Sequence, residues 1–120
     1  MYSDIVLKHF HNPKNLGKIE NADGVGNVGN EICGDTITLY IKVKDDVIED
    51  VKFETLGCAA AIASSSAFTE MVKGKKIEDA LKVTSDDVIK ALGGLPEYKT
   101  HCSMMAEEAL SIAIKSYREK

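Results

Sequence analysis

The hydrophobic and polar positions follow a two-residue period in the first half of the chain. Apolar and polar side chains alternate over residues 36–43, which predicts a strand with one face buried and one face wet. A second alternating run covers residues 50–55, after the charged turn at residues 44–46. A weaker strand is expected at residues 25–30. Because short turns join these segments, we expect them to form an antiparallel meander.

The remaining periodicity is helical. Helices are expected over residues 4–12, 59–72, 77–83 and 85–92, and from His101 or Cys102 onward. Ser3 and Ser85 are the expected N-caps, and Gly74 follows the second helix as a C′ residue. In the last helix, Met105, Ala109 and Ile112 are expected to face inward. Strands followed by helices predict an α+β fold, a three-stranded antiparallel sheet with the helices on one face.

Composition sets the scale and excludes several classes of protein. The chain has 120 residues and 44% hydrophobic residues, so we expect residues 1–120 to form a single domain with one core. A net charge of −4 argues against nucleic-acid binding, which requires a basic face. The longest apolar stretch, residues 58–63, is too short to span a membrane. The first residues contain no signal-peptide pattern, so we expect a cytoplasmic protein.

The three cysteines are the first candidates for chemistry. Their odd number cannot close a disulfide framework, and a simple alternative is that they are small buried hydrophobic residues. Each one, however, lies at the boundary of a predicted element. Cys33 lies in the loop before the first long strand, and Cys58 and Cys102 lie at predicted helix starts. Helix N-termini favour anions, and such an environment lowers the pKa of a thiol.

Two further side chains accompany the cysteines. Asp35 lies two residues after Cys33, and His101 directly precedes Cys102; both residue types bind zinc or iron. Taken alone, Asp35 is a common turn residue and His101 a common surface residue. His9 and His11 have no such neighbours and are expected to face solvent. A permanent iron–sulfur centre usually has four cysteine ligands, so three thiolates leave the fourth position to Asp35, His101 or an external donor. Such a ligand set suits a scaffold that releases its iron–sulfur cluster.

The chain resembles the iron–sulfur cluster assembly scaffolds of the IscU type and the N-terminal domain of NifU. The resemblance covers essentially the whole chain. It is carried by the motif at residues 9–15 (HFHNPKN), by Cys33-Gly34-Asp35, by Gly57-Cys58 with residues 61–66 (AIASSS), by residues 69–74 (TEMVKG), and by Leu95-Pro96 leading to Lys99 and His101-Cys102-Ser103. The resemblance implies a compact α+β fold in which the three cysteines meet at one exposed end.

The resemblance also implies residue roles. Cys33, Cys58 and Cys102 match the three cysteine ligands of the family, and Cys102 matches the acceptor of persulfide sulfur. Asp35 matches the aspartate that keeps the cluster labile, and His101 matches the histidine beside the last cysteine. Lys99 matches a lysine near the site that offsets thiolate charge. By this resemblance the protein is a scaffold or carrier without classical enzymatic turnover.

Cofactors and partners follow from the same resemblance. Scaffolds of this family build a [2Fe–2S] cluster, and they also bind Zn²⁺ in its place. Their partners are a cysteine desulfurase of the IscS or NifS type, electron-donor and iron-donor proteins, and recipient apo-proteins; a homo-oligomer around the cluster is also compatible. Residues 95–99 read LPEYK where scaffolds with a dedicated Hsp70 usually read LPPVK, so such a chaperone is not implied.

Two alternatives to the scaffold remain open at this point. One is a zinc-containing sulfur-transfer protein of the SufU type that accepts persulfide. Those relatives carry an insertion between the second and third cysteines and lack the histidine, and this chain has neither change. The other is a small domain with a purely structural zinc, which would unfold when the metal is removed.

Overall fold

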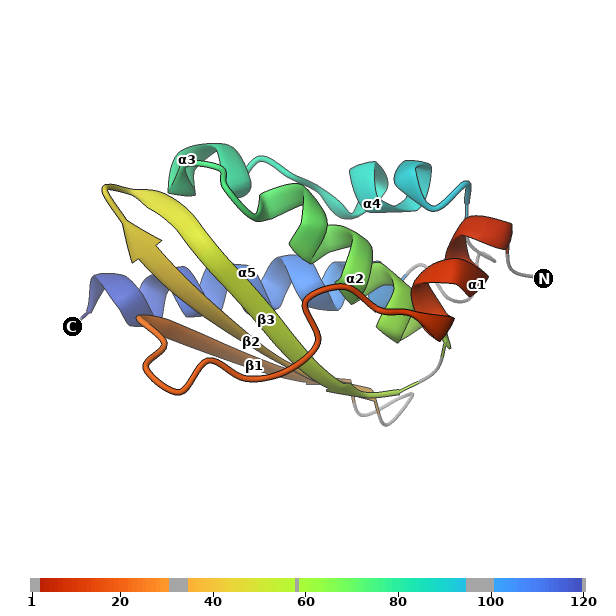
Figure 1. Ribbon diagram of the computed structural model, residues 1–120, viewed down its shortest axis with the longest axis horizontal. Coiled ribbons are helices and arrows are strands. Elements are labelled where there is room, and N and C mark those ends of the chain that lie inside the picture. The colour runs from red at the N-terminus through yellow and green to blue at the C-terminus, as the bar shows by residue number, and fades with distance from the viewer. Residues whose placement is uncertain (1–2, 31–34, 58, 95–100, 120) are drawn as a thin grey trace.

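The computed structural model of the protein describes residues 3–30, 35–57, 59–94 and 101–119. For Asn30, Ala59 and residues 101–103, the structure describes the backbone but not the side chain. Within these residues, three strands form one antiparallel sheet in the order β1-β2-β3: β1 (Gly24–Asn30), β2 (Asp35–Lys44) and β3 (Val47–Leu56). The predicted meander is therefore confirmed (Figure 1).

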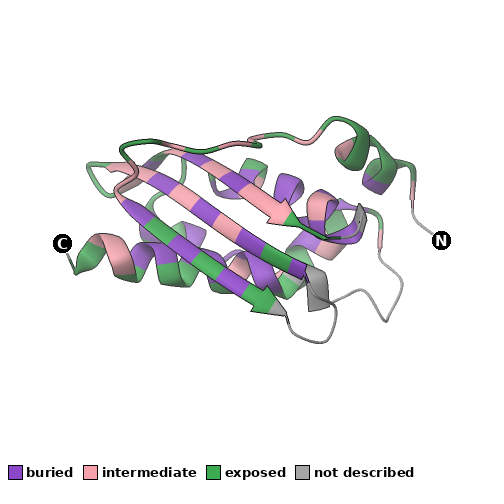
Figure 2. Cartoon of the chain, turned by 90° about the horizontal axis from the view of Figure 1, so that it is seen from below, coloured by how far each residue is buried: buried purple, intermediate pink, exposed green. Residues whose placement is uncertain are grey.

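The sheet alternates as the sequence predicts. Ile37, Leu39 and Ile41 of β2 are buried, and the residues between them are more exposed (Figure 2). The strand β3 begins at Val47, earlier than expected, because the turn is confined to Asp45 and Asp46. Both of these residues have positive φ, of 54° and 62°, as a two-residue hairpin turn requires.

The helices α2 (Ala59–Val72) and α5 (His101–Arg118) cover one face of the sheet (Figure 1). Helix α5 packs on β1 and β2, and α2 packs on β3. The close approach of α5 to β1 requires glycine, because a Cβ added at Gly26 would lie 2.0 Å from the carbonyl oxygen of Ala109. The predicted α+β class, with helices packed on one sheet face, is confirmed.

The N-terminal helix α1 (Asp4–His11) packs against α2, and the chain then follows the outer edge of the sheet. Gly17 donates its N–H to the carbonyl of Phe53 at 2.8 Å, and Phe53 donates to the carbonyl of Asn15 at 2.9 Å. These bonds pair part of the edge strand β3, which reduces the number of its backbone groups open to another chain.

Two short helices join α2 to the last part of the chain: α3 (Ile77–Ala80) and α4 (Ser85–Ala91). Helix α3 is shorter than expected. The prediction that Ser85 caps α4 is wrong, because Thr84 accepts from the N–H of Asp87 and the Asp87 carboxylate accepts from Thr84 in a capping box. Gly93 and Gly94, with φ of 77° and 103°, end the helix as expected.

The buried face of α5 differs from the prediction at one position. Met105 and Ala109 are buried, but Ile112 is 39% exposed, and the next two residues, Ala113 and Ile114, are buried in its place. At about 100° per residue, the buried positions 105, 106, 109, 110, 113 and 114 span about half of the helix circumference, and Ile112 lies just outside this arc, beside Met105. None of the helices in the described residues is long and apolar enough to cross a membrane.

Candidate metal centre

The sheet register brings the described residues that flank Cys33 and Cys58 to one end of the sheet. Asn30, the last residue of β1, pairs with Asp35, the first residue of β2, and Thr36 pairs with Leu56 at the end of β3. The chain therefore leaves the sheet toward Cys33 and toward Cys58 at the same end. Helix α2 begins at Ala59, immediately after Cys58.

The direction of α5 brings the third segment to the same end. A Cβ added at Gly24 would lie 2.1 Å from the carbonyl oxygen of Ala113, whereas one added at Gly26 would meet that of Ala109. The helix thus runs antiparallel to β1. Two strand residues and four helix residues cover similar lengths, about 6.6 and 6 Å. Continuing this spacing from the pair Gly26 and Ala109 places the backbone of His101 beside Asn30. In Figure 1 the first turn of α5 lies at this end of the molecule.

Asp35 is the candidate ligand whose side chain is described. It is 5% exposed, and a Cβ added at Gly57 would lie 2.9 Å from both its Cγ and its Oδ1. The carboxylate therefore packs against the glycine that precedes Cys58. This contact joins the start of β2 to the residue that follows β3, and a larger residue at position 57 would displace the carboxylate.

The other candidates are placed less fully. Cys33, Cys58 and Lys99 lie outside the described residues, and His101 and Cys102 are described by their backbone only, as the first two residues of α5. Among the side chains that are described, no group of three histidines, aspartates, glutamates or cysteines is arranged to hold a metal ion. The structure thus places the segments that flank the cysteines at one end, and the ligand set stays a prediction.

The expectation that His9 faces solvent is wrong. Its Nδ1 lies 2.7 Å from the Oγ of Ser66 in α2, and the backbone N–H of Lys14 donates to the same Oγ at 2.8 Å. Partial burial lowers the pKa of His9, an effect that Lys14 and Lys8 reinforce and that Glu70 opposes. Neutral His9 is the form that accepts a hydrogen bond from the Ser66 hydroxyl. His11, in contrast, is exposed.

The partner of His9 belongs to a buried polar cluster inside α2, within the motifs at residues 61–66 and 69–74, whose contacts those motifs did not predict. Ser64, Ser65, Ser66 and Thr69 are all buried. Asn15 donates to the hydroxyl of Thr69 at 3.1 Å, and that hydroxyl donates to the carbonyl of Ser66 at 2.8 Å. The run of serines inside an otherwise apolar helix could have indicated these contacts, because buried polar groups in a protein generally have hydrogen-bond partners.

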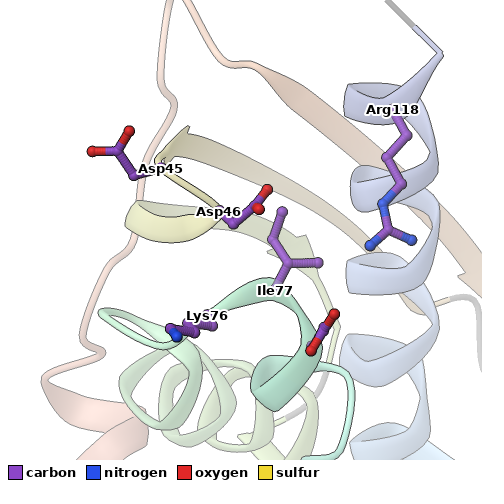
Figure 3. A pocket seen from close by; sticks show the side chains of 6 residues that line it. Asp45, Asp46, Lys76, Ile77 and Arg118 are labelled. Carbon is purple, nitrogen blue, oxygen red and sulfur yellow. The ribbon is translucent and has the colours of Figure 1, made fainter.

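A hollow of about 250 Å³ lies at the opposite end of the molecule (Figure 3). It is lined by Asp45, Asp46, Lys76, Ile77, Glu78 and Arg118. The β2–β3 turn and the last turn of α5 contribute to it, so it lies far from the sheet edge that carries Asp35. Asp35, the predicted site residue whose side chain is described, does not line it.

The family model for the NifU-like N-terminal domain matches residues 1–120. The chain belongs to the NifU-like N-terminal domain family. This finding confirms the family predicted from the motifs.

Relatives in the NifU-like family agree with this assignment. The chain is 65% identical over 120 residues to the iron–sulfur cluster assembly scaffold protein IscU 1 of Archaeoglobus fulgidus, covering 100% of this chain and 78% of the relative. It is 53% identical to the scaffold protein IscU of Aquifex aeolicus, covering 99% and 77%. Among solved structures, a nitrogen-fixing NifU-like protein (N-terminal) from Brucella abortus superposes with a TM-score of 0.79 at 26% identity, covering 98% and 94%.

Proposed function

We propose that this protein is a scaffold on which iron–sulfur clusters are assembled and from which they are transferred to apo-proteins. One observation carries the proposal: the segments that flank Cys33, Cys58 and Cys102 meet at one end of the sheet, where the Asp35 carboxylate packs against Gly57. The names of the relatives, which are cluster assembly scaffolds, support the same function.

The cargo that fits this donor set is a [2Fe–2S] cluster. Three cysteine thiolates would hold the two irons, and Asp35 or His101 would complete the set. A carboxylate is a harder donor than a thiolate and binds iron of a sulfide cluster less strongly, which favours release. Zn²⁺, which accepts cysteine, histidine and aspartate ligands, would occupy the same residues in the absence of iron.

Sulfur would enter through Cys102. Its thiolate attacks the terminal sulfur of a persulfide on a cysteine desulfurase, so that a new S–S bond forms on Cys102 and the donor cysteine leaves as a thiolate. The position of Cys102 in the first turn of α5 favours the thiolate form through the helix dipole. Lys99 would offset the charge of the thiolates. Electron-donor, iron-donor and recipient proteins would complete the cycle, in a reducing compartment such as the cytosol.

Anaerobic reconstitution tests the scaffold function. The protein is incubated with a cysteine desulfurase, cysteine, a reductant and ferrous iron, and the visible spectrum, acid-labile sulfide and iron content are measured. We expect sulfide-to-iron charge-transfer bands and equal amounts of iron and sulfide, and we expect recipient apo-ferredoxin to acquire the cluster afterwards. Replacing Cys102 by serine should abolish assembly, whereas the Ser111→Ala control, a change on the exposed face of α5, should assemble normally.

The same experiment separates the zinc-containing sulfur-transfer alternative. A protein of that type would keep bound zinc under these conditions, would take up sulfur as persulfide, and would show no charge-transfer bands. That outcome would replace the scaffold proposal. The identity of 65% to an archaeal IscU favours the scaffold.

Asp35→Ala tests the role of the carboxylate. We expect the bound cluster to survive several-fold longer and to transfer more slowly to an apo-ferredoxin, because the hard donor that helps to release iron is gone. Cluster loss and transfer are followed by circular dichroism in the visible range. Asp50→Ala is the matched control, since Asp50 pairs with Lys73 away from this end of the sheet. Transfer by Asp35→Ala at the wild-type rate would contradict the role.

A further inference from the structure

The two edges of the sheet differ in how the rest of the chain covers them. The edge strand β3 pairs with residues 15–17 at Phe53 and with residues 74–75 at Ile48, through backbone hydrogen bonds of 2.8 and 2.9 Å. The other edge of the sheet is β1. Within the described ranges, no segment other than β2 pairs with it.

The hydrogen bonds of β2 show which backbone groups of β1 point outward. Val43 donates its N–H to the carboxylate of Asp23 at 2.8 Å, and the carbonyl of Ile41 accepts from the N–H of Asp23 at 2.8 Å. The odd-numbered residues of β2 therefore direct their backbone groups toward β1, and the register pairs them with its even-numbered residues. Because successive residues of a strand alternate, the other residues of β1 direct their N–H and C=O groups away from the sheet. These residues are Val25, Asn27 and Gly29.

The open edge has none of the features that usually protect an edge strand. Charged side chains, proline and β-bulges normally prevent another strand from adding there. The sequence of β1, GVGNVGN, has no charge and no proline, and its pairing with β2 runs without a register shift from Gly24 to Asn30. In the part of the chain that the structure describes, the outward backbone groups of β1 make no hydrogen bond. The edge can therefore accept a further strand.

Helix α5 excludes a second copy of the chain as that strand. The helix lies directly over β1, because a Cβ added at Gly24 or Gly26 would lie 2.1 or 2.0 Å from its carbonyl oxygens. If two copies paired their β1 strands antiparallel, both α5 helices would lie on the same face, above strands about 4.8 Å apart. Packed helices need about 8–10 Å between their axes. The partner is therefore a segment with no helix above it.

The size of the edge indicates a partner that binds transiently. The strand β1 has 7 residues. At about 3.4 Å per residue, a strand paired along its whole length extends over roughly 24 Å and buries on the order of a few hundred Å². A stable complex buries about 800 Å² on each partner. Pairing along β1 alone is thus suited to a partner that docks and leaves.

The side chains around the edge indicate the composition of the partner segment. Val25 is 40% exposed, on the face of the sheet away from α5, and would contact an apolar residue of the added strand. Glu107 accepts from the N–H of Ser85 on one flank of α5, and Ile112, which is 39% exposed, lies on the opposite flank, toward the open edge. Residues of the added strand that point toward α5 must therefore be small.

We propose that the free edge of β1 is a docking site for an extended, uncharged segment of a transient protein partner. The segment pairs with the outward backbone groups of Val25, Asn27 and Gly29, and its small side chains under α5 alternate with apolar ones beside Val25. Backbone hydrogen bonds give the affinity, and the alternating side chains give the specificity. The site includes no candidate metal ligand, so the proposal goes beyond the proposed function and does not depend on it.

Asn27→Pro blocks the edge selectively. Proline removes the outward N–H and places its ring where the added strand would lie, whereas the even-numbered residues keep their bonds to β2. Asn27→Ala is the matched control. Both changes remove the bond from the Asn27 amide to the Thr38 hydroxyl at 2.6 Å, but alanine keeps the backbone N–H.

The probe is a peptide with blocked ends, in which serines and valines alternate between terminal lysines. It is titrated to about 1 mM into the ¹⁵N-labelled protein, and amide shifts and amide hydrogen exchange are measured by NMR. We expect exchange at Val25, Asn27 and Gly29 to slow by about threefold or more when the peptide is bound. Asn27→Pro should bind the peptide about tenfold more weakly than Asn27→Ala, which should match the wild type.

A second probe keeps the test valid if Asn27→Pro does not fold. The same peptide with every amide N-methylated has no backbone donor, so it cannot form the ladder and should produce no shifts in β1 of the wild-type protein. Equal binding of the two peptides would overturn the proposal.

Three further results would also overturn it. One is the absence of shifts in β1 at the highest peptide concentration, and another is equal affinity of Asn27→Pro and Asn27→Ala. The third is slower exchange at the outward amides as the protein concentration rises without peptide, together with a dimer in sedimentation, which would assign the edge to a second copy. None of these results bears on cluster assembly, which the reconstitution experiment measures separately.

Discussion

The hydroxyl of Ser66 is the residue-scale feature that secures the N-terminal segment. It accepts from the N–H of Lys14, and it donates its own hydrogen to the Nδ1 of His9 when the imidazole is neutral with its proton on Nε2. Because Ser66 is fully buried, loss of either partner would leave its desolvated hydroxyl with only one of these two bonds. The protonation state of His9 is therefore tied to the docking of α1.

The stability of the protein should depend on pH through His9. Partial burial lowers the pKa of His9 in the folded state below its ordinary value of 6.5. The unfolded chain therefore binds a proton at higher pH than the folded protein, and the free energy of unfolding should fall as the pH decreases through 6.5. The fall should level off once folded His9 is protonated as well. Urea unfolding between about pH 5 and 8 measures the effect.

His9→Asn isolates this contribution, because the amide oxygen replaces the Nδ1 acceptor without titrating in this range. The difference in unfolding free energy between wild type and His9→Asn should vary with pH in the window around pH 6.5. His11→Asn, a change at an exposed position of the same helix, should leave the wild-type profile unchanged. A pH-independent difference for His9→Asn would show that the protonation of His9 is not coupled to folding.

At the scale of elements, the contact between α5 and β1 depends on the absence of side chains. Gly24 and Gly26 face α5 so closely that an added Cβ would meet the carbonyl oxygens of Ala113 and Ala109. Since this contact also sets where α5 begins, it determines the position of the Cys102 backbone relative to the sheet edge. The glycines of β1 thus help to position the first turn of α5 at the candidate metal centre, although they do not lie in it.

Gly26→Ala should destabilise the protein by about 1–3 kcal/mol, because the new methyl group overpacks the α5 interface. Gly29→Ala in the same strand is the matched control, because its Cβ would meet only Thr36 Cγ2, at an ordinary 3.8 Å. Urea denaturation of both variants gives the comparison. Equal stabilities for the two variants would mean that α5 shifts on β1 without cost.

At the scale of the whole molecule, the core is apolar and continuous. It joins α2, α5 and the inner face of the sheet, with Phe53, Phe68, Leu39 and Leu110 almost fully buried. The candidate metal centre lies at one end of this core and is not its centre. We expect a core of this kind to hold the fold without a metal ion.

Chelation should therefore leave the protein folded. We expect the far-ultraviolet circular dichroism spectrum after treatment with EDTA to match that of the metal-loaded form, with cooperative thermal unfolding retained at a somewhat lower Tm because a ligand of the folded state is lost. Loss of helical signal on chelation would instead identify a structural zinc domain. Restoration with Zn²⁺ controls for irreversible damage.

The sequence alone determined the elements and the family. Alternation in β2 and β3, the glycines that end α2 and α4, and the start of α5 were predictable, because these features depend on residues close together in the chain. The motifs also gave the candidate ligands, whose roles stay a prediction. The cap of α4 and the exposure of Ile112 were missed by one position, because local patterns fix a helix face and its boundary only approximately.

The tertiary structure decided which distant residues meet. The bond of His9 to Ser66, the bond of Ser3 to Leu92 and the packing of Asp35 on Gly57 each join residues from different elements. No local pattern encodes such a pair, because the contact forms only when both elements pack on the same core. The convergence of the residues that flank the cysteines at one end of the sheet has the same origin: it follows from strand register and from the direction of α5, which the fold as a whole sets.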